Sequence, residues 1–431
     1  MKNKKGFILS TYVYILLVFF LLLLSTMLAV LNNTRILSNK LKEQSSNTSG
    51  LVNKDFSFVL LGDKEMILFK GEEFIDPGYI IKSSGGNDLS DIVKVTGSVN
   101  NNVIGNYELT YTAIYNGVTK TISRNVEVVI PTLVQKIESL VTDTNTEGLE
   151  LTSDGNIRYT GSSPKNYIKF NDELWRIIGI FNMTTASGST EKLVKIVRNE
   201  QFSQTMSWDS SASDVNGGVG VNEWSQADLM AMLNTYYIGT SSTCSYCGED
   251  SQGTCSNDCS SSVTPIGSTY TPMIEEVVWN TGAITTTTSI EVSSAYMEER
   301  GTTGKICTSN EYCNDSVTRT TTWQGKVGLI YPSDYGYASI DTSCRANIKN
   351  NTNYPCKNNN WLHLGTEYWT LSPSARSNYA FNAWYVFSSG YVNFTNASYG
   401  NGVRPAIYLK SNVFITSGYG SSSLPYQISM N

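Results

Sequence analysis

Side chains that could carry catalysis are few and scattered along the 431-residue chain. The only histidine, His363, lies between apolar residues in the run WLHLG, where a packed or surface histidine is more common than a general base. The carboxylate pairs Asp172/Glu173 and Glu298/Glu299 are adjacent in sequence and are expected to be solvated. Glycine-rich phosphate loops are absent from the sequence. We therefore expect neither catalysis nor a bound cofactor.

The cysteines form a second set of reactive side chains, Cys244, Cys247, Cys255, Cys259, Cys307, Cys313, Cys344 and Cys356. Their even number, beyond an apolar N-terminal segment, indicates disulfides formed in an oxidising compartment. The alternative is a zinc site built from Cys244–Cys247 and Cys255–Cys259, but the two spacings differ and the histidine is distant in sequence. We expect disulfides and no metal, and the sequence leaves the pairing open.

The stretch from Tyr368 to Leu409 has the composition of a recognition surface. Asn, Ser, Tyr and Phe fill 17 of the 29 positions from Ser374 to Gly402, and the only charged residues from Trp369 to Leu409 are Arg376 and Arg404. Aromatic rings offer large contact area with two side-chain torsions to fix, and Ser and Asn offer adaptable hydrogen bonds, as in antibody paratopes. The alternative is an ordinary Tyr/Asn-rich hairpin at the end of a secreted β-domain.

Alternating residues predict a β-hairpin in this stretch, turning at Ser388-Ser389-Gly390. Its apolar face consists of Trp384, Val386, Val392 and Phe394. Its other face consists of Tyr385, Phe387, Tyr391 and Asn393. A buried Asn393 amide would need a partner, so we expect this second face to lie in solvent as a binding surface.

The first fifty residues predict a membrane anchor. Lys2, Lys4 and Lys5 precede an apolar run from Phe7 to Leu31. As a helix this run is roughly 37 Å long at about 1.5 Å per residue, enough to cross a hydrocarbon core of about 30 Å. The lysines then place the N-terminus in the cytoplasm. We expect a retained single transmembrane helix and a polar linker over residues 1–50, with a cleaved signal peptide as the alternative.

The order Lys5-Gly6-Phe7 before this run resembles a type IV pilin leader, which implies cleavage between Gly6 and Phe7. The acidic residue expected fifth after the cut is Thr11 here. The resemblance therefore implies a minor pilin-like or pseudopilin protein, with pilin subunits as partners, or a plain anchored protein.

Residues 51–131 contain short segments, several of them alternating, separated by turn residues, which predict an all-β sandwich. The motifs GEEFIDPG (71–78) and GNYELTY (105–111) resemble the bacterial Ig-like domains found in tandem on surface proteins. Such modules usually act as spacers, and no site is carried over from them. Residues 132–165 follow as a connector, with a short helix expected over Leu133–Val141.

Residues 166–431 are expected to form an α+β domain. A helix is expected near Met273–Trp279 and a strand over Gly325–Tyr337. The motifs ELWRIIGIF, GLIYPSDYGYA, YWTLSPSA and GVRPAIYLKS resemble a family of bacterial extracellular domains with C-type-lectin-like architecture, related to the formylglycine-generating fold. An enzyme of that fold would need a reactive cysteine pair near the C-terminal site, yet the last cysteine is Cys356.

Within this domain, the segment at about 369–405 is similar to the variable region of diversity-generating-retroelement target proteins. There a reverse transcriptase rewrites adenines, so that Asn codons become Tyr, Ser, Phe and others. The resemblance implies a fixed scaffold of Trp369, Trp384, Val386, Gly390, Val392, Gly402 and Arg404. It implies a ligand-binding set of Ser377, Asn378, Tyr379, Phe381, Asn382, Tyr385, Phe387, Ser388, Ser389, Tyr391, Asn393, Asn396, Ser398, Tyr399 and Asn401.

Together these features predict a receptor or adhesin on the bacterial cell surface or on a pilus, whose ligand is an extracellular protein or glycan. The net charge of −6 argues against nucleic acid as a partner. The alternatives are a minor pilin or pseudopilin that serves assembly, and an enzyme of the formylglycine-generating fold.

Overall fold

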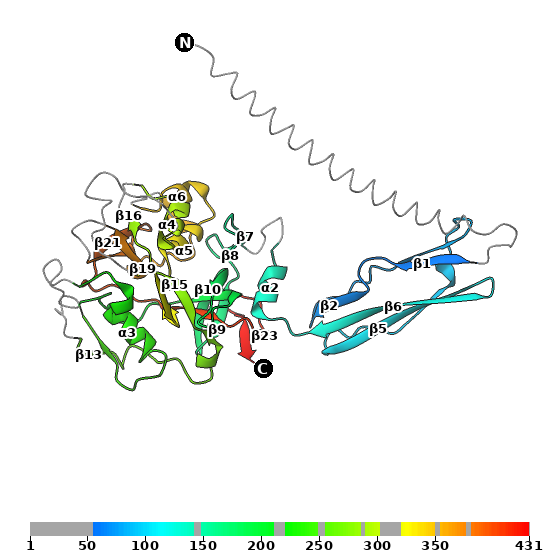
Figure 1. Cartoon of the computed structure of the whole chain (residues 1–431), viewed down its shortest axis with the longest axis horizontal. Helices are drawn as coiled ribbons and strands as arrows, with labels where there is room; N and C mark the ends of the chain where they lie inside the picture. The colour runs from blue at the N-terminus through cyan, green and yellow to red at the C-terminus, as the bar shows by residue number, and fades with distance from the viewer. Residues whose placement is uncertain are drawn as a thin grey trace, which may run out of the picture. The chain divides into compact units, whose positions relative to one another are not determined.

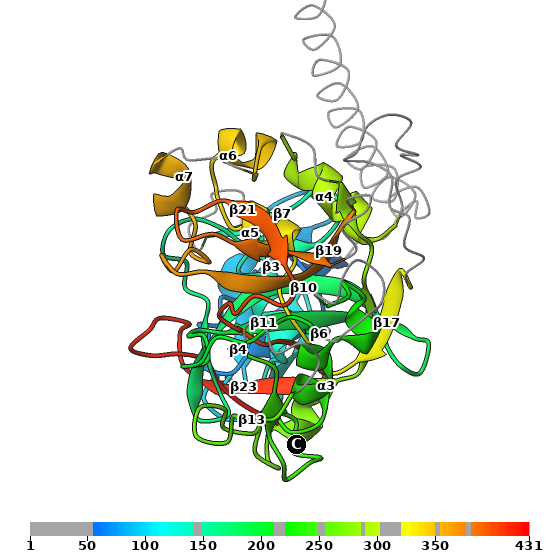
Figure 2. The same ribbon diagram turned by 90° about the vertical axis from the view of Figure 1, so that its left-hand side faces the viewer.

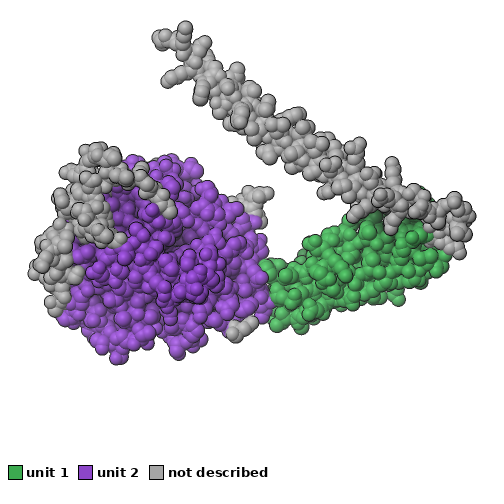
Figure 3. Space-filling view, in the orientation of Figure 1, with its two compact units in different colours: residues 1–129 green, residues 130–431 purple. Residues whose placement is uncertain are grey.

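The computed structural model describes residues 55–141, 148–210, 220–248, 255–285, 289–301, 320–349, 354–375 and 381–430. The chain divides into two compact units, residues 1–129 and residues 130–431, which are called here the N-terminal and C-terminal units (Figure 3). The predicted transmembrane helix and the Gly6–Phe7 leader site lie outside the described residues. Within the described ranges no helix is both long and apolar enough to span a bilayer.

The N-terminal unit is a sandwich of two β-sheets (Figure 1). One sheet has the order β2-β6-β5-β4, with β2 parallel to β6, and the other pairs β1 with β3. The strands are β1 (Phe56–Leu60), β2 (Glu65–Phe69), β3 (Tyr79–Ser83), β4 (Val93–Thr96), β5 (Gly105–Tyr115) and β6 (Val118–Val129). Alternate residues of β5, namely Leu109, Tyr111 and Ala113, meet Phe56 and Phe58 of β1 in one core, as the period of two in a strand dictates.

A buried arginine ties the loops of this sandwich together. Arg124 donates to the carbonyl oxygens of Leu61 (2.6 Å) and Gly78 (3.1 Å), and its Nε lies 3.2 Å from Asp76 Oδ1. Tyr111 Oη donates to the other oxygen of the same carboxylate at 2.7 Å. The motif GEEFIDPG therefore supplies the acid that compensates a buried guanidinium, which accounts for a charged residue in the core.

The C-terminal unit is built around an antiparallel sheet of order β14-β22-β11-β10-β8-β7, with β18 also paired to β22 and β9 to β10. Its strands are β7 (Leu149–Leu151), β8 (Ile157–Tyr159), β9 (Tyr167–Phe170), β10 (Glu173–Thr184), β11 (Thr190–Arg198), β14 (Ile274–Glu275), β18 (Val327–Gly328) and β22 (Ala406–Leu409). Residues Trp175 to Phe181 of β10 are all buried, so this apolar run lies inside the core. At Gly179 a β-carbon would lie 2.0 Å from the Ile157 carbonyl oxygen, so only glycine fits at this bulged position.

A second, smaller sheet of order β16-β19-β20-β21 carries the predicted recognition segment. Its strands are β16 (Ile284–Thr285), β19 (Tyr368–Ala375), β20 (Asn382–Val386) and β21 (Val392–Asn396). Helices α4 (Val292–Glu299), α5 (Pro332–Tyr337) and α6 (Thr342–Ala346) lie at the same end of the unit as this sheet (Figures 1 and 2). The remaining elements are α2 (Leu133–Ser139), α3 (Asp228–Asn234), α7 (Tyr354–Asn358), β12 (Ser245–Tyr246), β13 (Asn257–Asp258), β15 (Val277–Asn280), β17 (Thr322–Gly325), β23 (Val413–Ser417), β24 (Gln427–Met430) and three short 3-10 turns, Ser90–Ile92, Trp224–Gln226 and Thr271–Met273.

Two local expectations for this unit were wrong. Met273–Trp279 is not a helix, because β14 pairs with β22 and β15 pairs with β17. The stretch Gly325–Tyr337 begins with short strands but ends as helix α5, which has Pro332 in its first turn and begins where Asp334 Oδ2 accepts from Tyr331 N.

An ion pair lies in the core between the large sheet and α5. Lys195 Nζ of β11 is 2.6 Å from Asp334 Oδ2, and the two side chains are 0% and 2% exposed. The same carboxylate oxygen accepts from Tyr331 N at 2.9 Å. The ammonium also lies 4.2 Å from the centre of the Tyr331 ring and 5.2 Å from that of Trp279. Burial lowers the pKa of Lys195, and Asp334 opposes that effect.

Candidate binding surface

The predicted hairpin is present as β20 and β21. The strands are antiparallel, and Trp384 lies opposite Phe394, Tyr385 opposite Asn393, and Val386 opposite Val392. The turn is closed by Phe387 N donating to Tyr391 O (2.8 Å) and Gly390 N donating to Phe387 O (2.9 Å). This register places the two predicted sets of side chains on opposite faces.

The residues expected to form the scaffold are all buried. Trp384 packs edge-on against Phe394 with ring centres 5.3 Å apart. Trp369 Nε1 donates to Met206 O at 2.7 Å, and Arg404 Nε donates to Arg198 O at 3.0 Å. The other members of this set are also buried, namely Val386, Gly390, Val392 and Gly402.

The two scaffold glycines allow close packing. A β-carbon on Gly402 would lie 1.9 Å from Gln201 Oε1 and 2.7 Å from Glu367 O. Gly390 has φ +92°, and a β-carbon there would lie 2.4 Å from Lys357 Cβ of α7. A larger residue at Gly390 would therefore be strained and would collide with the helix behind the turn.

Four of the residues expected to face a ligand are instead buried, namely Asn382, Tyr385, Ser398 and Asn401. Tyr385 is only 7% exposed, because its ring packs edge-on against Trp369 (6.1 Å) and Phe387 (6.0 Å). The prediction that Tyr385 lies on a solvent-facing surface was therefore wrong. Its neighbour Trp369 comes from β19 and covers the outer face of β20.

The other described members of the predicted ligand-binding set form an accessible surface that is smaller than predicted. Tyr399 is 42% exposed and Ser389 is exposed. The half-buried members are Phe381, Phe387, Ser388, Tyr391, Asn393 and Asn396. Phe387 and Tyr391 stack on each other with ring centres 4.9 Å apart and an interplanar angle of 25°. Ser377, Asn378 and Tyr379 lie outside the described residues.

Side chains from outside the segment hold it through its backbone. Asn222 Nδ2 donates to Asn382 O (2.7 Å) and to Ser374 O (3.1 Å). Ser207 Oγ lies 2.8 Å from both Ser398 O and Gly248 O, so its one hydroxyl hydrogen is shared between these two carbonyl groups. Met206 N donates to Asn401 O (2.9 Å) and Asn401 N to Met206 O (3.1 Å).

By contrast, the side-chain oxygens Asn382 Oδ1 and Ser398 Oγ have no hydrogen-bond partner within the described part of the chain. The roles of Ser207 and Asn222 could not be predicted from the sequence, because both side chains act across more than a hundred residues.

A carboxylate stands beside the aromatic side chains of the turn. Glu367 Oε1 accepts from Ser388 Oγ at 3.4 Å. Burial first, and then the nearby Glu367 and Tyr391, raise the pKa of Tyr385. Glu367 was not among the predicted site residues, although it is the only acidic residue after Asp341 in the sequence.

The predicted disulfides are present among the described cysteines. They join Cys244 to Cys259, Cys247 to Cys255 and Cys344 to Cys356. Cys307 and Cys313 lie outside the described residues.

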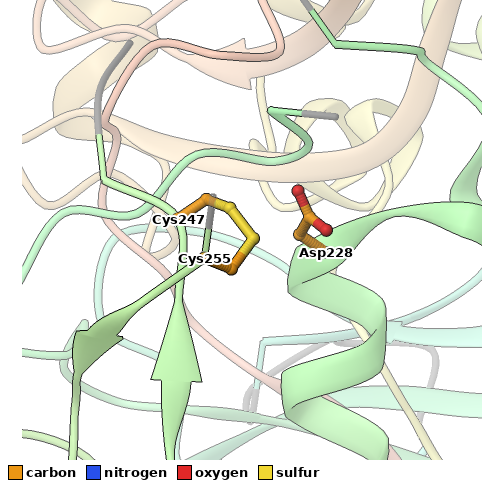
Figure 4. A group of neighbouring side chains, drawn as sticks. All are labelled: Asp228, Cys247 and Cys255. Atoms are coloured by element: carbon orange, nitrogen blue, oxygen red, sulfur yellow. A yellow bond between two sulfur atoms is a disulfide. The ribbon is translucent and has the colours of Figure 1, made fainter. Parts of the chain in front are cut away.

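Among the described residues, Asp228 of α3, Cys247 and Cys255 lie close enough together to be considered as a metal site (Figure 4). These sulfurs are bonded to each other and are not thiolates, and Asp228 Oδ2 accepts from Ser210 N at 3.0 Å. Zinc prefers thiolate ligands, so this group does not fit it.

The candidate catalytic residues are separated in the fold. His363 is half-buried, and burial together with Lys357 lowers its pKa. Its backbone N–H donates to Asn360 O at 3.1 Å. Its Nδ1 has no hydrogen-bond partner within the described ranges. Asp172 is exposed, as expected.

Glu298 and Glu299 are buried, which contradicts the expectation that they are solvated. Glu298 Oε2 accepts from Thr285 N at 2.7 Å. Glu299 accepts from Ser333 N at 2.9 Å and lies 3.3 Å from Arg300 Nη1. Both carboxylates thus hold α4 to neighbouring elements. Burial raises the pKa of Glu299 to about 7, although Arg300 and Ser333 act in the opposite direction.

We expect Glu299 to make the C-terminal unit less stable as pH rises from about 4.5 to about 7. Its folded pKa exceeds its value of 4.5 in the unfolded chain, so the folded state binds the proton more tightly in this window. The resulting loss approaches about 3 kcal/mol above pH 7 and vanishes below pH 4.5. Glu299→Gln cannot ionise and should lack this slope.

The measurement is urea unfolding at about pH 5 and about pH 8, followed by tryptophan fluorescence. All 8 tryptophans belong to residues 130–431, so the signal reports this unit alone. His363 is present in both proteins, so its effect on the free energy of unfolding cancels when wild type and Glu299→Gln are compared. Equal changes in the free energy of unfolding for wild type and Glu299→Gln would contradict the prediction.

Comparison with known proteins gives one family match. Residues 58–128 match the model of the bacterial surface protein Ig-like domain. No curated protein matches the chain.

Three similar solved structures overlap about a third of the chain. A lipoprotein from Bacteroides thetaiotaomicron is 21% identical with a TM-score of 0.17, and the match covers 34% of this chain and 61% of that one. The CBM51-2 and INT domains of Clostridium perfringens ZmpB, in complex with GlcNAc, are 12% identical with a TM-score of 0.16, over 36% and 32% of the two chains. The same domains in a second structure are 12% identical with a TM-score of 0.14, over 34% and 30%.

The chain thus spans about three fifths of the lipoprotein and about a third of the ZmpB structures, and these scores establish no shared fold. What the comparisons do show is that the N-terminal unit contains a bacterial surface Ig-like domain.

Proposed function

We propose that this chain is a bacterial surface receptor or adhesin whose C-terminal unit has a C-type-lectin-like fold and presents a diversified binding surface at residues 369–405. In this proposal the N-terminal apolar segment anchors the chain in the membrane, or in a pilus after cleavage at Gly6–Phe7. The Ig-like module acts as a spacer. The chain binds an extracellular protein or glycan non-covalently and catalyses no reaction on it.

The observation that carries the proposal is the way the segment is held. Fixed residues such as Ser207 and Asn222 bind backbone carbonyl groups at positions 398 and 382, and the side chains at those positions contribute no hydrogen bond from the oxygens Ser398 Oγ and Asn382 Oδ1. A backbone carbonyl is present whatever the side chain. The path of the segment at these two buried positions therefore does not depend on hydrogen bonds from their own side-chain oxygens.

The position of the accessible aromatic residues supports the same proposal. Tyr399 is exposed and Tyr391 is half-buried, while Trp369 and Trp384 of the same segment are buried. Buried rings fix the strands, and accessible rings supply contact area whose loss of conformational entropy on binding is small. The binding set is narrower than the sequence predicted, because four of its members lie inside.

The DNA beside the coding region tests the diversification. We expect a reverse-transcriptase gene and an imperfect copy of the codons for residues 369–405 that differs at adenines. The differences should fall on codons of the ligand-binding set and spare those of the seven scaffold residues. A neighbourhood without such a copy, together with only synonymous variation in sister strains, would contradict this part of the proposal.

A further inference from the structure

Among the described residues, the accessible part of the surface contains one carboxylate with no counter-ion. Glu367 is half-buried, and its carboxylate accepts a weak hydrogen bond from Ser388 Oγ at 3.4 Å. No Lys, Arg or His nitrogen of the described residues lies within ion-pair distance of it. It is also the only acidic residue between positions 342 and 431. A partly desolvated carboxylate without a cation is costly, and a cationic ligand would offset that cost.

Aromatic side chains lie near Ser388, the residue whose hydroxyl donates to Glu367. Phe387 and Tyr391 stack 4.9 Å apart, and Tyr385 stands edge-on to Phe387 at 6.0 Å. Tyr385 is in turn fixed by Trp369, so the group is rigid on one side. Ring faces attract cations, and the attraction grows as water is excluded.

The strand register places the carboxylate beside this group, because Tyr368, which follows Glu367, pairs with Val386, which precedes Phe387. Burial is the main cause of the raised pKa of Tyr385, and Glu367 and Tyr391 are the next contributors. His363 adds no positive charge at neutral pH, because burial and Lys357 lower its pKa.

We propose that Glu367, Phe387 and Tyr391, supported by the buried Tyr385 and called together with it the aromatic–acid cluster, receive an arginine side chain of a protein ligand. A guanidinium group is planar, stacks on aromatic rings, is weakly hydrated and offers paired donors to a carboxylate. A glycan stacks on rings as well, but its neutral hydroxyl groups leave the charge of Glu367 uncompensated. The inference rests on the proposed function and names the chemistry of its ligand.

The cluster combines a residue outside the diversified segment with three residues inside it. Glu367 precedes position 369, whereas Tyr385, Phe387 and Tyr391 belong to the ligand-binding set. Every diversified version would therefore keep the acid, and the preference for a cation would be shared while the surrounding rings change.

The test is selection of a random heptapeptide phage library on the full chain in detergent micelles. We expect wild type to enrich peptides with arginine at one position. Replacing that arginine by citrulline, which has nearly the same shape without the charge, should weaken binding of the selected peptide at least tenfold. Glu367→Gln should weaken it to a similar extent and should no longer enrich arginine.

Two variants serve as controls. Glu200→Gln removes an exposed carboxylate of the same unit and should leave peptide binding unchanged. Tyr391→Ala should abolish binding of every selected peptide, since it removes the stacked ring. Tryptophan fluorescence on urea titration checks that each variant remains folded.

The outcomes separate this inference from the proposed function. Peptides that lack a basic residue, yet lose binding with Tyr391→Ala, would overturn the arginine inference and leave the proposed function standing. A third outcome is that no peptide is enriched and that wild type binds a glycan on an array through Tyr391 but not Glu367. That outcome would overturn the arginine inference and identify the ligand as a sugar. Absence of peptide and glycan binding by wild type would overturn both.

Discussion

Lys195→Met is expected to lower the free energy of unfolding of the C-terminal unit by about 3–5 kcal/mol. The substitution leaves the Asp334 carboxylate, which is 2% exposed, without the ammonium that lies 2.6 Å away. Methionine fills a similar volume among the Trp279 and Tyr331 rings, so the loss comes from the uncompensated charge rather than from a cavity. Urea unfolding followed by tryptophan fluorescence measures it.

Two further variants separate this cause from a general effect of removing lysine. Lys169→Met breaks an exposed pair with Asp172 at 3.5 Å and should change stability by less than about 1 kcal/mol. Adding Asp334→Asn to Lys195→Met removes both buried charges and keeps an acceptor for Tyr331 N. The double variant should recover most of the loss. If Lys195→Met were no less stable than Lys169→Met, the buried Lys195–Asp334 pair would contribute nothing to stability.

Trp384→Ala is expected to cost about 3–5 kcal/mol in the same unit. The indole is fully buried, packs against Phe394 and lies with its Nε1 3.4 Å from Ile284 O. Its removal leaves a cavity between β20, β21 and β16, the strands that carry the binding surface. The midpoint of urea unfolding, with tryptophan fluorescence as the signal, provides the measurement.

Tyr399→Ala is the matched control for an aromatic residue of the same segment. The tyrosine is 42% exposed, so its truncation should change the free energy of unfolding by about 0.5 kcal/mol or less. Equal losses for the two variants would contradict the division of the segment into scaffold and surface.

The hairpin could be predicted because its pattern is local. Side chains of a strand alternate between faces, so the positions of Trp384 and Tyr385 on opposite faces follow from their adjacency. Whether the outer face meets solvent depends on other parts of the chain. Trp369 covers Tyr385, and nothing in the alternation of β20 and β21 contains that information.

The errors outside the site have the same origin. Ile274 and Val277 lie in strands because their partners, Leu409 and Gly325, are far along the chain. Glu299 looks like a solvated surface residue until Ser333 is brought to it. Helix α5 is different, since Pro332 followed by Asp334 is a helix-start signal that the sequence contains.

The disulfide between Cys344 and Cys356 links the binding turn to the redox state of its surroundings. Lys357, the next residue after Cys356, lies directly behind Gly390, which shapes the turn that presents Tyr391. Reduction would free the end of α7 and remove a fixed support from the back of the turn. For the receptor proposed here, a chain still in a reducing compartment would thus carry a looser hairpin than the oxidised chain.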